Sequence, residues 1–222
     1  MSDEISVDVA GLGKLAKAIP NKAWVQLVDT ACRTFRECIA PITATTSGIG
    51  RLIEAKFERL VDAEKLLAAD TMARAREKAA KSKKAAGGSI RPNIVIAILE
   101  AAATETDSLL RDLWSSLLAQ EMVNQNVHPE FTTILSKLSP REAYFLAKVA
   151  EGHRDKNAAL TAAIANILAQ TVSAGIIRYG PIDTFTTEHL GNLGLIKERG
   201  TSWVLTHTGR AFIQAVTSPA SE

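Results

Sequence analysis

The chain has 222 residues and a formal net charge of +2, and 46% of its residues are hydrophobic and 23% charged. This composition is typical of a folded soluble protein, and the small net charge neither demands nor excludes an anionic partner. The apolar run 94–103 is too short for a membrane span, and the acidic N-terminus lacks a signal-peptide pattern. Cys32 and Cys38 show neither metal-ligand nor disulfide spacing. We therefore expect a cytoplasmic protein with two reduced thiols.

The N-terminal third predicts long amphipathic helices. Residues 1–20 lead into a helix that begins at Asn21 and carries one apolar stripe, and Pro41 ends or kinks it. Ser47 is expected to cap a second long helix that continues into the Ala/Lys/Arg-rich tract 73–89. The apolar stripe of this second helix comprises Ile49, Leu52, Ile53, Phe57, Leu60, Val61 and Leu67. A Gly-Gly pair inside the tract is the expected linker.

The middle of the chain predicts a compact helical block. Residues 93–105 are expected to form a buried helix, and 106–122 an amphipathic helix capped by Thr106 or Asp107. A proline at the first helical position marks another helix directly after His128.

Two further helices follow. The strongest local signal in the chain opens the helix 139–152, which has a capping-box pattern formed by Ser139, Pro140 and Glu142. Residues 160–175 are expected to form an apolar helix that Gly175 closes.

The C-terminal residues predict the end of a winged helix. A short helix is expected at 184–193, and Gly194 makes the turn after it. Two short strands, "LIKE" and "WVLT", then flank the turn "RGTS", and Thr206 or Thr208 caps a last helix. A small core is expected from Leu195, Ile196, Trp203, Leu205 and Phe212.

These elements predict a mainly α protein with N-terminal long helices, a central helical block, and a C-terminal winged-helix-like module with a small β-hairpin. The expected boundaries are 1–86 for the long helices with the basic tract, 87–137 for the central block and 138–216 for the winged-helix-like domain. Residues 217–222 are expected to be a disordered tail.

Two stretches of the sequence resemble the abortive infection alpha family of bacteria. They are "RPNIVIAILEAAATETDSLLRDLWSSLLAQEM" and "VHPEFTTILSKLSPREAYFLAKV". The matching residues are Arg91-Pro92, Leu113-Trp114, Leu117-Leu118-Ala119, His128-Pro129, Phe131, Ile134-Leu135, Leu138-Ser139-Pro140, Leu193-Gly194-Leu195-Ile196, Leu205-Thr206, Gly209 and Phe212. The family more often has an acidic residue soon after its Ser-Pro, where this chain has Arg141 and then Glu142. The resemblance implies a role in defence against bacteriophage, often by stopping growth of the infected cell, and it implies no molecular mechanism.

The helix before the predicted wing is poorly suited to reading DNA. Residues 184–193 contain no lysine or arginine, they carry Glu188, and Asp183 lies directly before them. Base edges and phosphates are normally contacted by Arg, Lys, Asn or Gln, so carboxylates here are unfavourable. The wing itself offers Lys197 and Arg199, which are wing candidates for a backbone contact. We expect the module to serve packing or protein contacts rather than sequence-specific DNA binding.

The strongest basic feature of the chain is a tract between residues 70 and 91. Only two anions, Asp70 and Glu77, oppose its cations, which are Arg74, Arg76, Lys78, Lys81, Lys83, Lys84 and Arg91. The tract is interpreted first as a solvated helix end or linker, and otherwise as a contact to nucleic acid or another anion. Contact with anionic lipid is the third alternative. The absence of aromatic residues argues against base stacking.

The sequence shows no catalytic or metal-binding motif. Neither "GLGK" nor "SGIGR" completes a phosphate loop, the four histidines lack metal-ligand spacing, and there is no nucleophile elbow. We therefore expect a non-enzymatic antiphage protein without catalytic residues, metal or cofactor, which binds a protein partner or itself through the N-terminal helices. The alternatives are a winged-helix DNA-binding regulator and a membrane-active effector whose N-terminal helices insert into a bilayer.

Overall fold

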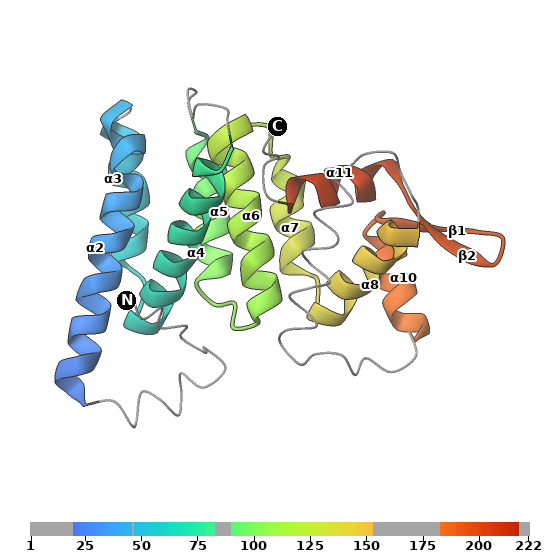
Figure 1. The fold of residues 1–222 in the computed structure, drawn as a ribbon, viewed down its shortest axis with the longest axis horizontal. Coiled ribbons are helices and arrows are strands. Elements are labelled where there is room, and N and C mark those ends of the chain that lie inside the picture. Colours follow the sequence, from blue (N-terminus) through green and yellow to red (C-terminus); the bar gives the residue numbers. More distant parts are fainter. Residues whose placement is uncertain (1–19, 46, 83–89, 153–182, 218–222) are drawn as a thin grey trace.

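The protein is mainly helical and has one small antiparallel hairpin near its C-terminus, as the sequence predicts (Figure 1). The structure, a computed structural model, describes residues 20–45, 47–82, 90–152 and 183–217. The predicted lead-in, the Gly-Gly linker, the apolar helix 160–175 and nearly all of the predicted tail lie outside these described residues. In chain order the elements are α2 (Asn21–Thr45), α3 (Ser47–Glu58), α4 (Asp62–Ala80), α5 (Pro92–Ala102), α6 (Ser108–Asn124), α7 (Pro129–Ser136), α8 (Pro140–Gly152), α10 (Thr184–Asn192), β1 (Ile196–Arg199), β2 (Ser202–Leu205) and α11 (His207–Ala215).

The two N-terminal helices differ from their predicted extents. Helix α2 does not end at Pro41 but continues to Thr45, although proline removes a backbone hydrogen bond inside a helix. The predicted second long helix is in fact two helices, α3 and α4, with a break at residues 59–61. Helix α4 starts after Val61, whose backbone N–H donates to the Glu64 carboxylate three residues later. Valine is not a typical capping residue, so this boundary has little signal in the sequence.

Helix α6 lies at the centre of the core. It is enclosed on most sides, and Trp114 near its middle is only 1% exposed. Helices α4 and α5 pack against α6, while α2 packs on the far side of α4, so the N-terminal helices form stacked layers (Figure 1). Phe35 of α2 stacks on Phe57 of α3 with ring centroids 3.7 Å apart. Buried apolar residues from α2 to α11 form one continuous cluster.

The helix starts follow the predicted capping patterns. Asp107 caps α6 by accepting the Leu110 N–H, and His128 caps α7 with Pro129 at its first turn. Ser139 and Glu142 form the predicted capping box, because Ser139 N donates to Glu142 Oε2 and Glu142 N donates to Ser139 Oγ.

The hairpin and α11 are joined by one close backbone approach. Strands β1 and β2 pair Ile196 with Leu205, and the Thr206 hydroxyl accepts the Gly209 N–H to cap α11. A Cβ atom at Gly209 would overlap the carbonyl oxygen of Leu195. Gly194 has a φ of +69°, in the left-handed region that favours glycine. The glycines that match the family pattern therefore let the hairpin pack onto the last helix.

Candidate functional site

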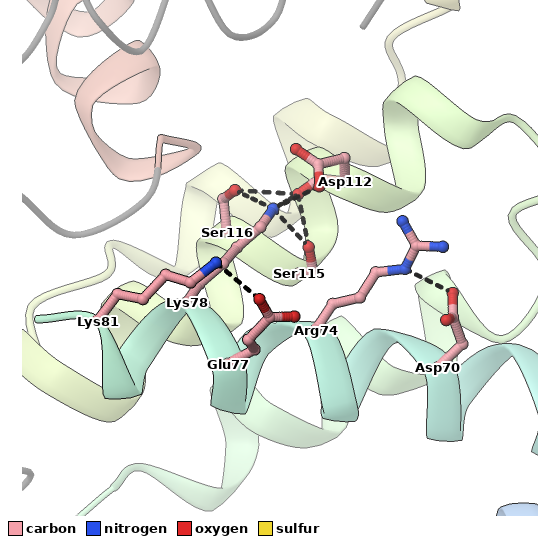
Figure 2. A network of polar contacts seen from close by, with 8 residues as sticks. All are labelled: Asp70, Arg74, Glu77, Lys78, Lys81, Asp112, Ser115 and Ser116. Atoms are coloured by element: carbon pink, nitrogen blue, oxygen red, sulfur yellow. Dashed lines mark hydrogen bonds and ion pairs between the residues drawn. The ribbon is translucent and has the colours of Figure 1, made fainter. Parts of the chain in front are cut away.

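The basic tract is divided between the interior and the surface of the protein. Its first cations lie on α4, which faces α6 on one side and solvent on another (Figure 2). Lys83 and Lys84 lie outside the described residues. The other predicted cations have intramolecular contacts, and these contacts separate them into two groups.

Lys78 points into the seam between α4 and α6 (Figure 2). Its Nζ donates to Asp112 Oδ1 at 2.6 Å and reaches the hydroxyls of Ser115 and Ser116 at 2.8 Å each. Both hydroxyls donate to the Asp112 carbonyl oxygen, so their lone pairs face the ammonium group. The Lys78 and Asp112 side chains are only 14% and 11% exposed. Burial lowers the pKa of Lys78, and the Asp112 carboxylate partly offsets this effect.

Arg91 has a comparable interior role at the start of α5. Its Nε and backbone N–H donate to Glu121 Oε1, and its second guanidinium nitrogen donates to Glu121 Oε2 at 2.6 Å. The same nitrogen donates to the Val127 carbonyl oxygen, also at 2.6 Å. Because the Glu121 side chain is 0% exposed, Arg91 neutralises a carboxylate that water does not reach. The Arg-Pro pair of the family resemblance thus ties the start of α5 to the end of α6.

Three cations of the tract, two on α4 and one at its C-cap, remain on the outside of the protein. Arg74 Nε donates to Asp70, which also accepts from Arg111 of α6. Arg76 donates to a backbone carbonyl of α2, and Lys81 forms an exposed ion pair with Glu77. Such exposed contacts are weak and exchange readily with water or another anion. These side chains are the accessible part of the tract in the described residues.

The hairpin and α10 form a second surface. Lys197 and Arg199 are exposed on β1, with Glu198 between them. Helix α10 exposes Phe185, which is 72% accessible, and the carboxylate of Glu188. The structure therefore brings the hairpin cations near a helix that has no lysine or arginine of its own.

Two polar contacts hold α10 against α8. His189 Nδ1 lies 2.5 Å from Glu142 Oε1, and Arg141 donates to Asp183 at 2.9 Å. Burial alone would raise the pKa of Glu142, but hydrogen bonds from Ser139 and His189 outweigh it and lower the pKa below its ordinary value. Glu142 thus completes the capping box of α8 and also holds α10 against α8 through His189.

A Glu142→Gln variant is expected to be less stable at pH 7 by about 1–2 kcal/mol, because it loses the charge that these hydrogen bonds favour. A lowered folded-state pKa adds stability that is present above the unfolded value of about 4.3 and lost as pH falls through the folded pKa. The difference in unfolding free energy between variant and wild type should therefore narrow as the pH falls below about 4.3. Urea unfolding across this range measures it, with Glu151→Gln, an exposed carboxylate on α8, as the control. A difference in stability that does not change with pH would contradict the stabilising role assigned to the Glu142 charge.

An open groove lies between α6, α7 and α11. It has a volume of about 750 Å³, and its polar lining includes His128, Glu130 and His207. His128 Nδ1 accepts the Glu130 N–H, so this histidine is occupied in capping α7. No group of three or more His, Cys, Asp or Glu residues within the described ranges is placed to hold a metal ion. Across the same ranges, no helix has the length and apolar character needed to cross a bilayer.

Sequence reasoning missed the interior partners of the tract. Asp112, Ser115 and Ser116 lie within a segment interpreted as an amphipathic helix, and Glu121 lies near its end. One signal was available, since the leucines together with Trp114, Ala119, Met122 and Val123 place apolar residues on nearly every side of this helix and leave its polar residues little access to solvent. Polar residues in such a helix need interior partners.

Comparison of the sequence with models of known protein families gave a match. The model for abortive infection alpha matches residues 58–216, which extends from the end of α3 to α11. Comparisons with curated proteins and with solved structures gave no significant match. Because the family model covers most of the chain, including the capped helices, the Arg91 contact and the hairpin, this protein belongs to the abortive infection alpha family.

Proposed function

We propose that this protein acts in abortive-infection defence against bacteriophage and that it works by contacting other macromolecules rather than by catalysis. Family membership supports the defence role. The observation that carries the mechanism is the pairing of three buried carboxylates across helix seams, namely Asp112 with Lys78, Glu121 with Arg91 and Glu142 with His189. These pairs hold the fold together, whereas other charged side chains, such as Arg76, Lys81 and Glu188, are exposed.

The contact surface proposed for nucleic acid is the accessible part of the basic tract. It comprises Arg74 and Arg76 on α4 and Lys81 at its C-cap, followed in the sequence by Lys83 and Lys84. Phosphates would displace the weak exposed ion pairs of these cations, with an affinity that falls as salt rises. Lys78 and Arg91 are left out of this surface because their charges are used in the interior.

Reversing the charge of Lys81, Lys83 and Lys84 together is expected to weaken protection against phage and leave the fold intact. Plaque counts with and without expression measure protection, and circular dichroism monitors the fold. The matched control reverses Arg33, Arg51 and Arg59, three exposed arginines on or beside α2 and α3, and changes the net charge equally. Full protection by the lysine variant would exclude the tract as a working surface. Unchanged plating by the wild type over a broad phage panel would refute the defence role itself.

The exposed Lys197 and Arg199 favour the DNA-binding regulator as a second candidate function. Gel retardation of duplex DNA at low and moderate salt tests it. A shift that is lost when these two residues are replaced would support this candidate, and no shift at micromolar protein would reject it. Vesicle flotation with anionic lipid tests the membrane-active alternative in the same way.

A further inference from the structure

Helix α10 presents an unusual outer face. Phe185 is the most exposed large hydrophobic side chain among the described residues, at 72%. The inner face of the same helix is well packed, because Thr186, Thr187 and Leu190 are buried. The exposure of Phe185 therefore does not come from a loosely docked helix. Single exposed apolar residues are common, so the surroundings of this ring decide what it means.

The surroundings of Phe185 hold the ring in place. Its centroid lies 5.8 Å from that of His189, with the two planes only 21° apart. His189 is itself fixed by Glu142 of α8, and Asp183 caps α10 while it accepts from Arg141. One side of the aromatic ring thus rests on an anchored imidazole, and a large part of it faces solvent. An aromatic ring ordered before binding loses little conformational entropy when a partner covers it.

The charge around the ring points to the kind of partner. Helix α10 contains no lysine or arginine, and Glu188 lies one turn after Phe185 on the exposed side. Within the part of the chain that the structure describes, Glu188 has no ion-pair partner. Asp183 adds a second carboxylate at the start of the helix. Asp183 is paired with Arg141, so Glu188 is the carboxylate that would attract a lysine or arginine beside Phe185.

We propose that the outer face of α10, centred on Phe185 and Glu188, docks a basic amphipathic segment of another protein. Phe185 packs against apolar side chains of that segment. Glu188 forms an ion pair with a lysine or arginine that neighbours those side chains. Aromatic side chains are enriched at protein–protein interfaces, and a complementary charge beside one favours the matching partner. This inference rests on the proposed function, in that the protein acts through macromolecular contacts, and it names the partner class for one surface. Helix α10 lies at the opposite end of the molecule from α2 (Figure 1).

A photo-cross-linking amino acid, benzoylphenylalanine, placed at position 185 tests the partner class. The control places it at Val25 on α2, which is 56% exposed. Cells expressing either variant are irradiated before and during phage infection, and the adducts are sequenced by mass spectrometry. We expect an adduct at 185 with one protein, on a peptide that carries lysine or arginine beside apolar residues. A nucleic-acid adduct, an adduct on an acidic peptide, or none above the Val25 control would overturn the proposal.

Binding of the purified cross-linked partner then tests the two side chains. Phe185→Ser and Glu188→Lys are each expected to raise the dissociation constant at least about tenfold without changing the thermal unfolding of the protein. Val25→Ser should leave the constant unchanged. Exchanging the partner's basic residue for glutamate should restore binding to Glu188→Lys, and failure to restore it would contradict the pairing.

Phage protection separates this inference from the proposed function. Phe185→Ser is expected to weaken protection, whereas Val25→Ser is not. If Phe185→Ser protects as well as the wild type, the docking surface is refuted and the defence role stands. If the wild type itself gives no protection, the defence role is refuted. The cross-linking result still tests, independently, whether the outer face of α10 docks a basic segment.

Discussion

An Arg91→Met variant is expected to lose about 3 kcal/mol of unfolding free energy, because it leaves the fully buried Glu121 carboxylate without its half-buried cation, whose side chain is 38% exposed. Arg91 satisfies both oxygens of Glu121, whose side chain is 0% exposed, and also the Val127 carbonyl oxygen. Methionine fills similar space but donates no hydrogen bond. The carboxylate would then remain buried without its cation, or would take up a proton at a cost in free energy.

Urea unfolding followed by circular dichroism measures this loss. The matched control is Arg36→Met, because Arg36 also contacts two carboxylates, Glu54 and Glu58, but is 56% exposed. Exposed pairs contribute little, so the control should lose no more than about 1 kcal/mol. The double variant Arg91→Met/Glu121→Leu should recover most of the stability, since it also removes the buried charge. Equal losses for the two arginine variants would contradict the role assigned to Arg91.

The helix starts and the hairpin were predictable because their signals are local. The capping box of α8, the Asp107 cap and the Pro129 start each depend on residues within one turn of the chain. The break before α4 was not predictable in this way, because its only polar signal is the side chain of Glu64 reaching back to Val61. The apolar stripe alone does not show where one helix ends and the next begins.

The roles of the basic residues were less predictable because their partners are distant in sequence. Lys78 and Lys81 look alike in an Ala/Lys-rich tract, yet Lys78 reaches residues 34 to 38 positions away on α6, and Lys81 reaches only Glu77. Spacing on α4 alone does not reveal that α6 lies against it. Some cations of the tract therefore anchor α4 to neighbouring elements, and others lie on the surface. No single interpretation applies to all of them.

The family pattern is largely a pattern of structural residues. Arg91 pairs with a buried carboxylate, His128 caps a helix, and Gly209 makes room for the Leu195 carbonyl oxygen. Residues of this kind identify the fold and give little information on the target. A search for the target is better directed to exposed residues outside the pattern, such as Phe185 and Glu188.

The contrast between the two lysines of α4 gives a further strong prediction. Lys78→Met is expected to lower the unfolding free energy by about 3 kcal/mol, because the Asp112 carboxylate and two serine hydroxyls would face an apolar side chain in a seam that excludes water. Lys81→Met should change it by no more than about 0.5 kcal/mol, because the Lys81–Glu77 pair is about two-thirds exposed on each side.

The two variants have the same change in charge, so general effects of lost charge cancel between them, and Lys81 lies at the C-cap of the helix that carries Lys78. Urea unfolding at pH 7 and low salt, repeated at high salt, measures the difference. Salt should reduce the small Lys81 effect and leave most of the Lys78 effect, because screening acts on exposed pairs more than on buried ones. If Lys78→Met were as stable as Lys81→Met, Lys78 would not anchor α4 to α6, and it would return to the surface proposed to contact nucleic acid.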